Sequence, residues 1–151
     1  MSKFANDTKL GSKVCTRDHC DVIQRDLDNL RSWSDKWLLN YNGDKCKVMH
    51  IGQNNVKYNC KLHGRTLIKV AEEKDLDVII TNGLECAAQC LFASRKANTV
   101  LGFIARNFYY KTPEVITRLY TSLVRLHLEY AVQFWSPFYQ RDINIFESVQ
   151  R

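Results

Sequence analysis

The sequence lacks a long hydrophobic run, a repeated segment and any low-complexity tract. Residues 119–138 come nearest to a membrane span, but charged or polar side chains interrupt them at Arg125, His127 and Glu129. A spanning helix needs about 20 predominantly apolar residues. No basic segment followed by an apolar segment and a small-residue cleavage site opens the chain, as it does in secretory leaders. We therefore expect a protein that is neither secreted nor integral to a membrane.

A disulfide framework is also missing. The six cysteines, at positions 15, 20, 46, 60, 86 and 90, do not follow the spacing of small secreted domains. Reduced thiols and an intracellular location, cytoplasmic or nuclear, are the expectation. Histidines lie near some of these cysteines, but no group has the spacing of a compact zinc site. A polar connector at 12–20, a hairpin near 60 and a helix core at 86–90 explain these residues better than metal binding does.

What the chain does contain is enough apolar material for one domain and an excess of positive charge. Its 151 residues are 45% hydrophobic, which is typical of a globular core. Lysine and arginine number 22 against 16 aspartates and glutamates, for a net charge of +6. This balance is compatible with a polyanionic partner such as nucleic acid.

One amphipathic segment organises the first half of the chain. Apolar residues recur at helical spacing from Ile23 to Leu38, and Trp33 and Trp37 lie on that face, where we expect them to be core. Asp18 or Asp21 is the expected N-cap. Polar turn residues follow, and residues 45–51 predict a short strand.

Strand patterns continue to residue 80. Residues 58–62 and 66–70 flank His63-Gly64-Arg65, which predicts a hairpin with Gly64 at positive φ. Residues 72–80 predict one further strand.

The helical period then returns over residues 84–108. Thr112-Pro113-Glu114 has the chemistry of a helix start, and residues 142–151 begin a last amphipathic helix. The fold class expected from these patterns is α+β.

Several segments, in order, resemble the reverse transcriptases of non-LTR retrotransposons of the LINE or jockey-like class. They are Phe4-Ala-Asn-Asp-Thr8, the run from Trp33 to Gly52, Lys74-Asp-Leu-Asp-Val78, and residues 119–131 with Phe134-Trp-Ser-Pro137. The resemblance implies a fragment of an RNA-directed DNA polymerase, a metal-dependent nucleotidyltransferase of a transposable element. Residues 1–82 would form a partial palm, a helix with short antiparallel strands. Residues 83–151 would form an all-helical, thumb-like part, truncated at its C-terminus.

The resemblance places a magnesium site at Asn6 and Asp7. Polymerases of this class use two Mg²⁺ ions held by carboxylates, one to activate the primer hydroxyl and one to steady the triphosphate. Asp7 matches a family aspartate, but the direct ligand is replaced by Asn6, which has no negative charge. We therefore expect a degenerate magnesium site and no polymerase activity of this chain alone. An ordinary polar turn is the alternative explanation of both residues.

Further residues take candidate roles from the resemblance. Lys45 matches a lysine near the triphosphate, with a catalytic role as charge or general acid, or else it is an exposed lysine that, beside Lys47, keeps a strand edge soluble. Lys47 is a nucleic-acid-binding candidate. Lys74 and Leu76 fit a motif that grips the primer, although Asp77 stands where that family has glycine.

A last candidate comes from composition rather than resemblance. Arg106 and Lys111 flank Tyr109 and Tyr110, and single-strand binders combine cations with aromatic rings in this way. An ordinary exposed surface has the same appearance. The partner that the resemblance implies is an RNA or DNA primer–template. Two alternative functions of the chain stay open: a non-catalytic nucleic-acid-binding remnant, and a protein-binding or poorly folded remnant.

Overall fold

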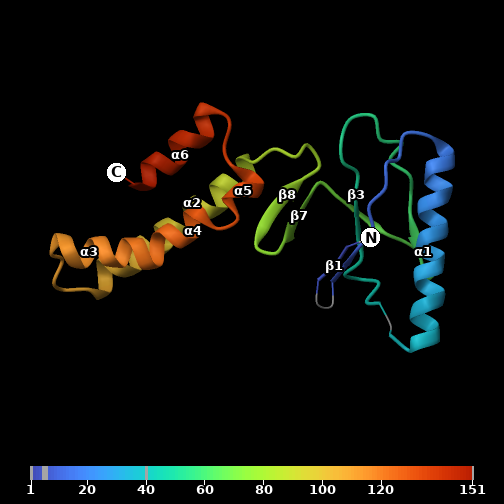
Figure 1. Ribbon diagram of the computed structural model, residues 1–151, viewed down its shortest axis with the longest axis horizontal. Coiled ribbons are helices and arrows are strands. Elements are labelled where there is room, and N and C mark those ends of the chain that lie inside the picture. The colour runs from blue at the N-terminus through green and yellow to red at the C-terminus, as the bar shows by residue number, and fades with distance from the viewer. Residues whose placement is uncertain (1, 5–6, 40, 151) are drawn as a thin grey trace. The chain divides into compact units, whose positions relative to one another are not determined.

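The computed structural model describes residues 2–4, 7–39 and 41–150, with only the backbone of residues 2–4 and 7. It confirms the α+β class: short strands in small sheets precede a largely helical second half (Figure 1). The elements, in chain order, are β1 Ser2–Phe4, β2 Asp7–Lys9, α1 Arg17–Trp37, β3 Lys47–Met49, β4 Lys61–Leu62, β5 Arg65–Thr66, β6 Ile68–Val70, β7 Glu72–Asp75, β8 Val78–Thr81, α2 Ala87–Asn107, α3 Pro113–Leu119, the π-helical segment η1 Tyr120–Val124, α4 Arg125–Glu129, α5 Val132–Trp135 and α6 Gln140–Gln150.

The chain divides into two compact units between Ala71 and Glu72. The first unit contains β1 to β6 and α1, and the second contains β7, β8 and the later helices. This division comes before the β7–β8 hairpin, whereas the sequence placed its boundary after it. The hairpin belongs with the helices because β8 packs against α2.

Helix α1 is the long helix of the first unit, and its start corrects the predicted cap. Thr16, not Asp18 or Asp21, is the N-cap, and its hydroxyl accepts a hydrogen bond from the His19 amide at 3.4 Å. Gln24 fixes the helix to β4: its side-chain Nε2 donates to the Lys61 carbonyl and its Oε1 accepts from the Lys61 amide, each at 2.9 Å. One glutamine thus satisfies both backbone groups of a strand residue.

The expectation that both tryptophans of α1 are core is wrong. Trp33 is 42% exposed and Trp37 is 60% exposed, while the buried residues of the helix are Cys20, Leu27 and Ser34. The helical period was correct in itself, but the rest of the first unit buries Leu27 and Ser34 and leaves both tryptophan side chains largely exposed. Helical spacing predicts which residues share a face and cannot predict what covers it.

The strands of the first unit form pairs. The predicted hairpin is confirmed: β4 and β5 are antiparallel, and His63 and Gly64, at φ 51° and 74°, form its turn. Strands β3 and β6 instead pair in parallel, with Val48 opposite Lys69. The expectation of antiparallel strands throughout is therefore wrong, because β6 passes beyond the hairpin and returns beside β3.

The second unit opens with a hairpin where a single strand was predicted. Strands β7 and β8 are antiparallel, and Leu76 and Asp77 form the turn between them at φ 46° and 65°. Two successive residues at positive φ are typical of glycine or asparagine, so the sequence carries no ordinary turn signal here. Glycine at position 77, as in the family that this segment resembles, would adopt that backbone conformation without steric strain.

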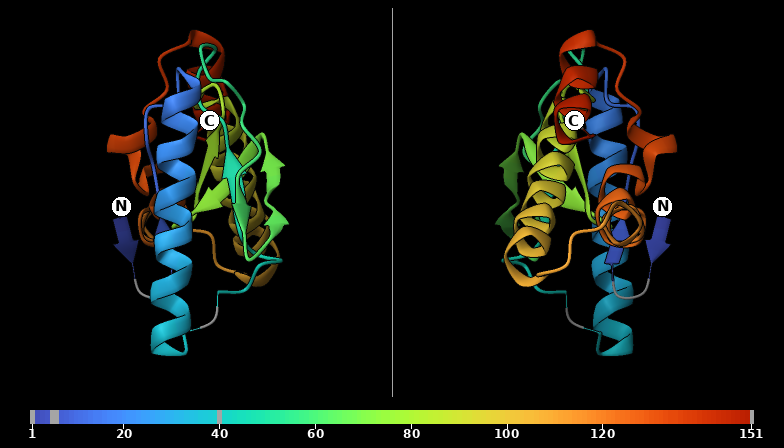
Figure 2. Two further views of the ribbon diagram at one scale, coloured as in Figure 1. Left: turned by 90° about the vertical axis from the view of Figure 1, so that its right-hand side faces the viewer. Right: turned by 90° about the vertical axis from the view of Figure 1, so that its left-hand side faces the viewer.

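Helices make up the rest of this unit (Figure 2). The predicted helix at 84–108 is confirmed as α2, and the predicted start at Thr112 is confirmed by the N-cap bond from the Val115 amide to its hydroxyl, at 3.4 Å. Segments α3, η1 and α4 follow one another without a break. Helix α6 begins at Gln140 and confirms the last predicted helix. No helix among the described residues is long and apolar enough to cross a membrane.

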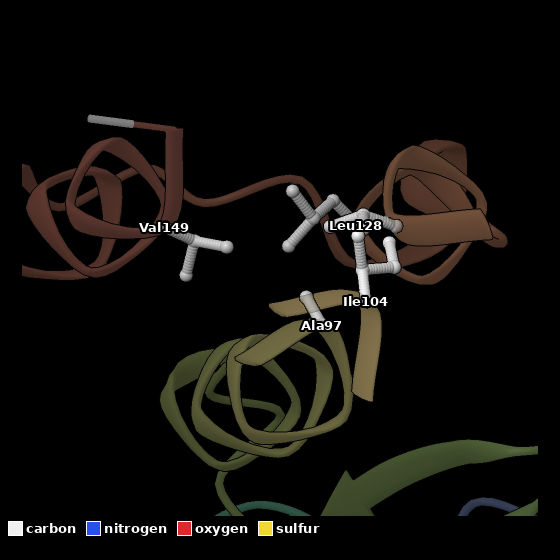
Figure 3. Close-up of a cluster of buried hydrophobic side chains, with 5 residues drawn as sticks. Ala97, Ile104, Leu128 and Val149 are labelled. Carbon is white, nitrogen blue, oxygen red and sulfur yellow. The ribbon is translucent and has the colours of Figure 1, made fainter. Parts of the chain in front are cut away.

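Two apolar clusters hold the second unit together. In the first, side chains from α2, α4 and α6 point toward one another (Figure 3), and its buried members are Ala97, Ile104, Val124, Leu128 and Val149. The second lies under the hairpin and contains Val78, Cys90, Ala93 and Trp135. Burial, with Cys86 and Asp142 nearby, raises the pKa of the Cys90 thiol to about 12, so this thiol stays protonated and unreactive.

Candidate nucleic-acid interface

The excess positive charge of the protein is concentrated in one stretch, residues 45–71, here called the basic segment. It contains six lysines or arginines and no aspartate or glutamate, and all six are exposed. Outside it, 22 − 6 = 16 basic residues balance the 16 acidic ones. The cations are Lys45, Lys47, Lys57, Lys61, Arg65 and Lys69. A stretch of this kind attracts a polyanion because it has no carboxylates to repel it.

The elements of the first unit spread these cations over more than one face. Lys47 lies in β3 opposite Ile68, and Lys69 lies in β6 opposite Val48. Opposed residues share a face of a sheet and successive residues alternate, so Lys47 and Lys69 lie on opposite faces of the pair. Lys61 and Arg65 stand on either side of the β4–β5 turn. A flexible single strand can follow such a surface more easily than a straight duplex.

The contacts of Arg65 and Lys69 restrain these two side chains only weakly. The Arg65 guanidinium is 3.7 Å from the Asp44 carboxylate, but both side chains are largely exposed, and such pairs contribute little. The Lys69 ammonium donates to the Lys57 carbonyl at 3.0 Å. A lysine held by one neutral carbonyl keeps its full charge for a phosphate.

His50 lies close to these cations and has an unusual environment. Its Nε2 is buried and has no hydrogen-bond partner. Burial lowers the pKa of His50, the nearby charges of Lys69 and Lys57 lower it further, and a hydrogen bond with Asn55 acts in the opposite direction. The folded protein therefore favours neutral His50.

This environment makes the stability of the protein depend on pH. The unfolded chain takes up a proton at His50 near pH 6.5 and the folded chain only at lower pH, so the free energy of unfolding should fall as the pH drops from 6.5 through the folded pKa. Urea unfolding at several pH values measures the effect. In the variant His50→Gln the acid-induced loss should be smaller. An equal loss in both proteins would contradict this explanation.

The predicted pair Lys74 and Leu76 belongs to a different cluster, in which one carboxylate pairs with two lysines. The Lys74 and Lys96 ammonium groups contact the Asp77 carboxylate at 2.6 and 2.5 Å, and each lies 4.8 Å from the ring centroid of Phe92. Hydrogen bonds from the two lysines hold the pKa of Asp77 below its usual value. The carboxylate already occupies both cations, which leaves Lys74 less able to bind a phosphate.

Beside this cluster lies a cavity of about 10 Å³, lined in part by His127. It has room for about one water molecule and no larger ligand. The Tyr130 hydroxyl donates to the Leu76 carbonyl at 3.0 Å, which ties α4 to the hairpin turn. The contacts of Leu76 are thus structural, although its side chain remains half exposed.

Arg106 and Lys111 lie at the end of α2. The Lys111 ammonium donates to the Ala105 carbonyl at 2.8 Å, and the Arg106 guanidinium folds back along the helix toward Gly102. The rings of Tyr109 and Tyr110 are exposed and meet edge to face at 5.4 Å. The cluster is accessible, and its binding role stays a prediction.

The remaining predicted residues concern catalysis. Asn6 lies outside the described residues, and of Asp7 the structure gives the backbone, which opens β2 opposite Phe4. The predicted magnesium site therefore stays a prediction. Within the described part of the chain, no three histidine, cysteine, aspartate or glutamate side chains are grouped to hold a metal. Lys45 is exposed in the loop before β3, where its amide donates to the Asn42 carbonyl at 3.1 Å.

Sequence reasoning missed the basic segment as a unit, although its signal is visible without a structure. A count of charges along the chain, rather than over the whole chain, finds it. No protein-family model, no curated protein and no solved structure matches this chain. Its function must be argued from its own residues.

Proposed function

We propose that this protein binds nucleic acid without catalysing a reaction on it, and that the basic segment supplies most of the contacts. The observation that carries the proposal is the placement of the entire net charge of +6 in residues 45–71, with every cation exposed. Phosphates attract such a surface regardless of sequence, and the counterions released on binding provide the free energy.

The resemblance to non-LTR reverse transcriptases supports the same kind of partner. It suggests that the chain derives from an RNA-directed DNA polymerase and retains parts of the palm and thumb-like regions. Catalysis is not part of the proposal, because Asn6 replaces the carboxylate that such enzymes use to hold magnesium. Lys45 then acts as one cation of the basic segment and not as a general acid.

A titration at several salt concentrations tests the proposal. The full chain is titrated into a fluorescent single strand and into a duplex, and anisotropy reports binding. Because each phosphate contact changes the slope of log K against log salt by about −0.7 for a single strand, engagement of most of the six cations gives a slope of about −3 to −4. Absence of binding at low salt, or binding that salt does not weaken, would contradict the proposal.

Magnesium provides a second arm of the same experiment. As a counterion, Mg²⁺ competes with the cations of the protein, so we expect it to weaken binding at constant ionic strength. Binding that Mg²⁺ strengthens would instead indicate that Asn6 and Asp7 hold a metal. We also expect no extension of a primer by the chain with Mg²⁺ and nucleoside triphosphates.

The exposed aromatic faces favour a second candidate function, contact with another protein. Trp37 is 60% exposed on α1, and Phe134 and Phe138 are 69% and 85% exposed around α5. Exposed apolar side chains contribute to contact surfaces where they form a contiguous patch. Strong binding of a dye specific for apolar surface, together with no affinity for nucleic acid, would favour this candidate over the first.

A further inference from the structure

A hollow of about 330 Å³ lies in the first unit, where α1 begins and the chain passes from β3 toward β4. Its volume is within the range of small-molecule sites, which begins near 300 Å³. The lining residues are Arg17, Cys20, Val56, Lys57, Tyr58 and Asn59. Neither the strand pairs nor the apolar clusters of the second unit explain why these six residues line one hollow.

The lining has one sign of charge. Arg17 and Lys57 contribute two cations, and no carboxylate is among the lining residues. An arginine presents two parallel N–H donors to phosphate oxygens, and a lysine adds a mobile point charge. The ligand charge that fits this hollow is therefore negative, and a phosphate is a group that each of the two side chains can bind.

Two exposed hydrogen bonds orient the backbone of Lys57. Its backbone has φ 53°, stabilised by a hydrogen bond from its amide to the Asn55 side chain at 2.9 Å, and its carbonyl accepts from the Lys69 ammonium at 3.0 Å. These two bonds fix the backbone from which the Lys57 side chain reaches the hollow. A fixed backbone reduces the entropy lost when a ligand binds.

The remaining residues suit a planar ring more than a second charge. Tyr58 is partly buried and brings an aromatic ring, Asn59 brings a carboxamide, and Val56 brings an apolar side chain. The thiol of Cys20 already donates a hydrogen bond to the Thr16 carbonyl at 3.4 Å. Bases stack on aromatic side chains, and a carboxamide can both donate to and accept from a base edge.

We infer that this hollow binds a nucleoside monophosphate, with the phosphate on Arg17 and Lys57 and the base against Tyr58. The nucleotide is either free or the phosphorylated end of a strand, since both present the same chemistry. The inference goes beyond charge-driven strand binding, because a phosphate monoester carries nearly two negative charges and can use both Arg17 and Lys57, whereas each backbone diester carries one.

The first experiment titrates the full chain at low salt with adenosine 5′-monophosphate, and separately with adenosine and with inorganic phosphate. Calorimetry or chemical-shift changes report saturation. Because the nucleotide combines the charge-assisted hydrogen bonds of its phosphate with the stacking of its base, it should bind about tenfold or more tightly than either of its parts. Nucleotide binding no tighter than that of phosphate, or no saturable binding at all, would overturn the inference.

Substitutions locate the binding. Arg17→Gln should lower the affinity for the nucleotide about tenfold by removing a charge-assisted contact. Tyr58→Leu should also lower the affinity for the nucleotide, but it should leave the affinity for inorganic phosphate unchanged. Arg25→Gln is the matched control: Arg25 is an exposed arginine on the same helix and does not line the hollow. Equal effects of Arg17→Gln and Arg25→Gln would show that only general charge matters and would overturn the site.

Oligonucleotides distinguish the two sources of the ligand. A terminal phosphate that raises affinity in the native chain but not in Arg17→Gln assigns the site to a strand end. Saturable binding of the free nucleotide without that effect assigns it to a free nucleotide. Failure of an unphosphorylated strand to bind contradicts the proposed function alone, because free nucleotide binding is measured without any strand.

Discussion

Replacing Trp135 by alanine is expected to lower the free energy of unfolding of the second unit by about 3–5 kcal/mol, the usual cost of removing a large buried aromatic side chain. Trp135 is 5% exposed and packs with Val78, Cys90 and Ala93 beneath the hairpin. Its ring stacks on Phe146 with the centroids 5.5 Å apart. The substitution removes this ring and leaves a cavity between α2 and α6.

A hydrogen bond adds to the effect. The indole Nε1 of Trp135 donates to the Tyr130 carbonyl at 2.8 Å and so secures the turn between α4 and α5. Trp135→Phe keeps most of the apolar area and loses this bond, so its cost should be smaller, about 1–3 kcal/mol. Urea unfolding of the full chain, followed by far-ultraviolet circular dichroism, measures both variants. If Trp135→Ala lowers the free energy of unfolding less than Trp135→Phe does, this packing is contradicted.

The second large effect concerns binding. Replacing Lys45, Lys47, Lys61 and Arg65 by glutamine together should weaken single-strand binding by about 10²–10³-fold at 0.1 M salt, because each lost phosphate contact removes about 0.7 from the salt slope. These four cations belong to the basic segment and lie outside the nucleotide hollow. Anisotropy titrations at three or more salt concentrations give both the affinity and the slope.

A matched control removes the same number of charges from the second unit. Arg95, Arg106, Lys111 and Arg118 are exposed, and changing them to glutamine lowers the net charge equally. If the basic segment is the interface, this control loses little affinity and keeps its salt slope. A larger loss in the control would instead place the interface at the cluster around Tyr109 and Tyr110, as its cationic and aromatic composition first suggested.

Local chemistry was the part of the fold that could be predicted. The β4–β5 hairpin followed from Gly64, and the start of α3 from Thr112 and Pro113, because each signal acts over a few residues. The β7–β8 turn was missed for the converse reason. Asp77 holds its positive φ beside two lysines, one of them on α2, so the stabilising contact is distant in sequence.

Neither the pairing of the strands nor the burial of each helix face could be predicted from the sequence. The parallel pairing of β3 with β6 depends on how the chain passes beyond a hairpin, and the exposure of Trp37 depends on what lies opposite α1. Of the candidate site, the cations could be listed from the sequence. That Asp77 pairs with Lys74, whereas residues 45–71 contain no carboxylate, required the structure and a charge count along the chain.

The π-helical segment η1 determines the rotational phase of the helix that contains it. Ile116, Tyr120, Val124 and Leu128 all join the same apolar cluster, although they recur every four residues. In a regular α-helix a step of four turns each successive side chain by about 40° around the axis, so this stripe would rotate away from α2. The wider turn of η1 absorbs that drift. The helix therefore contains one residue more than a regular α-helix of the same number of turns. This extra residue forms a bulge on the side where Thr121, Ser122 and Leu123 are exposed.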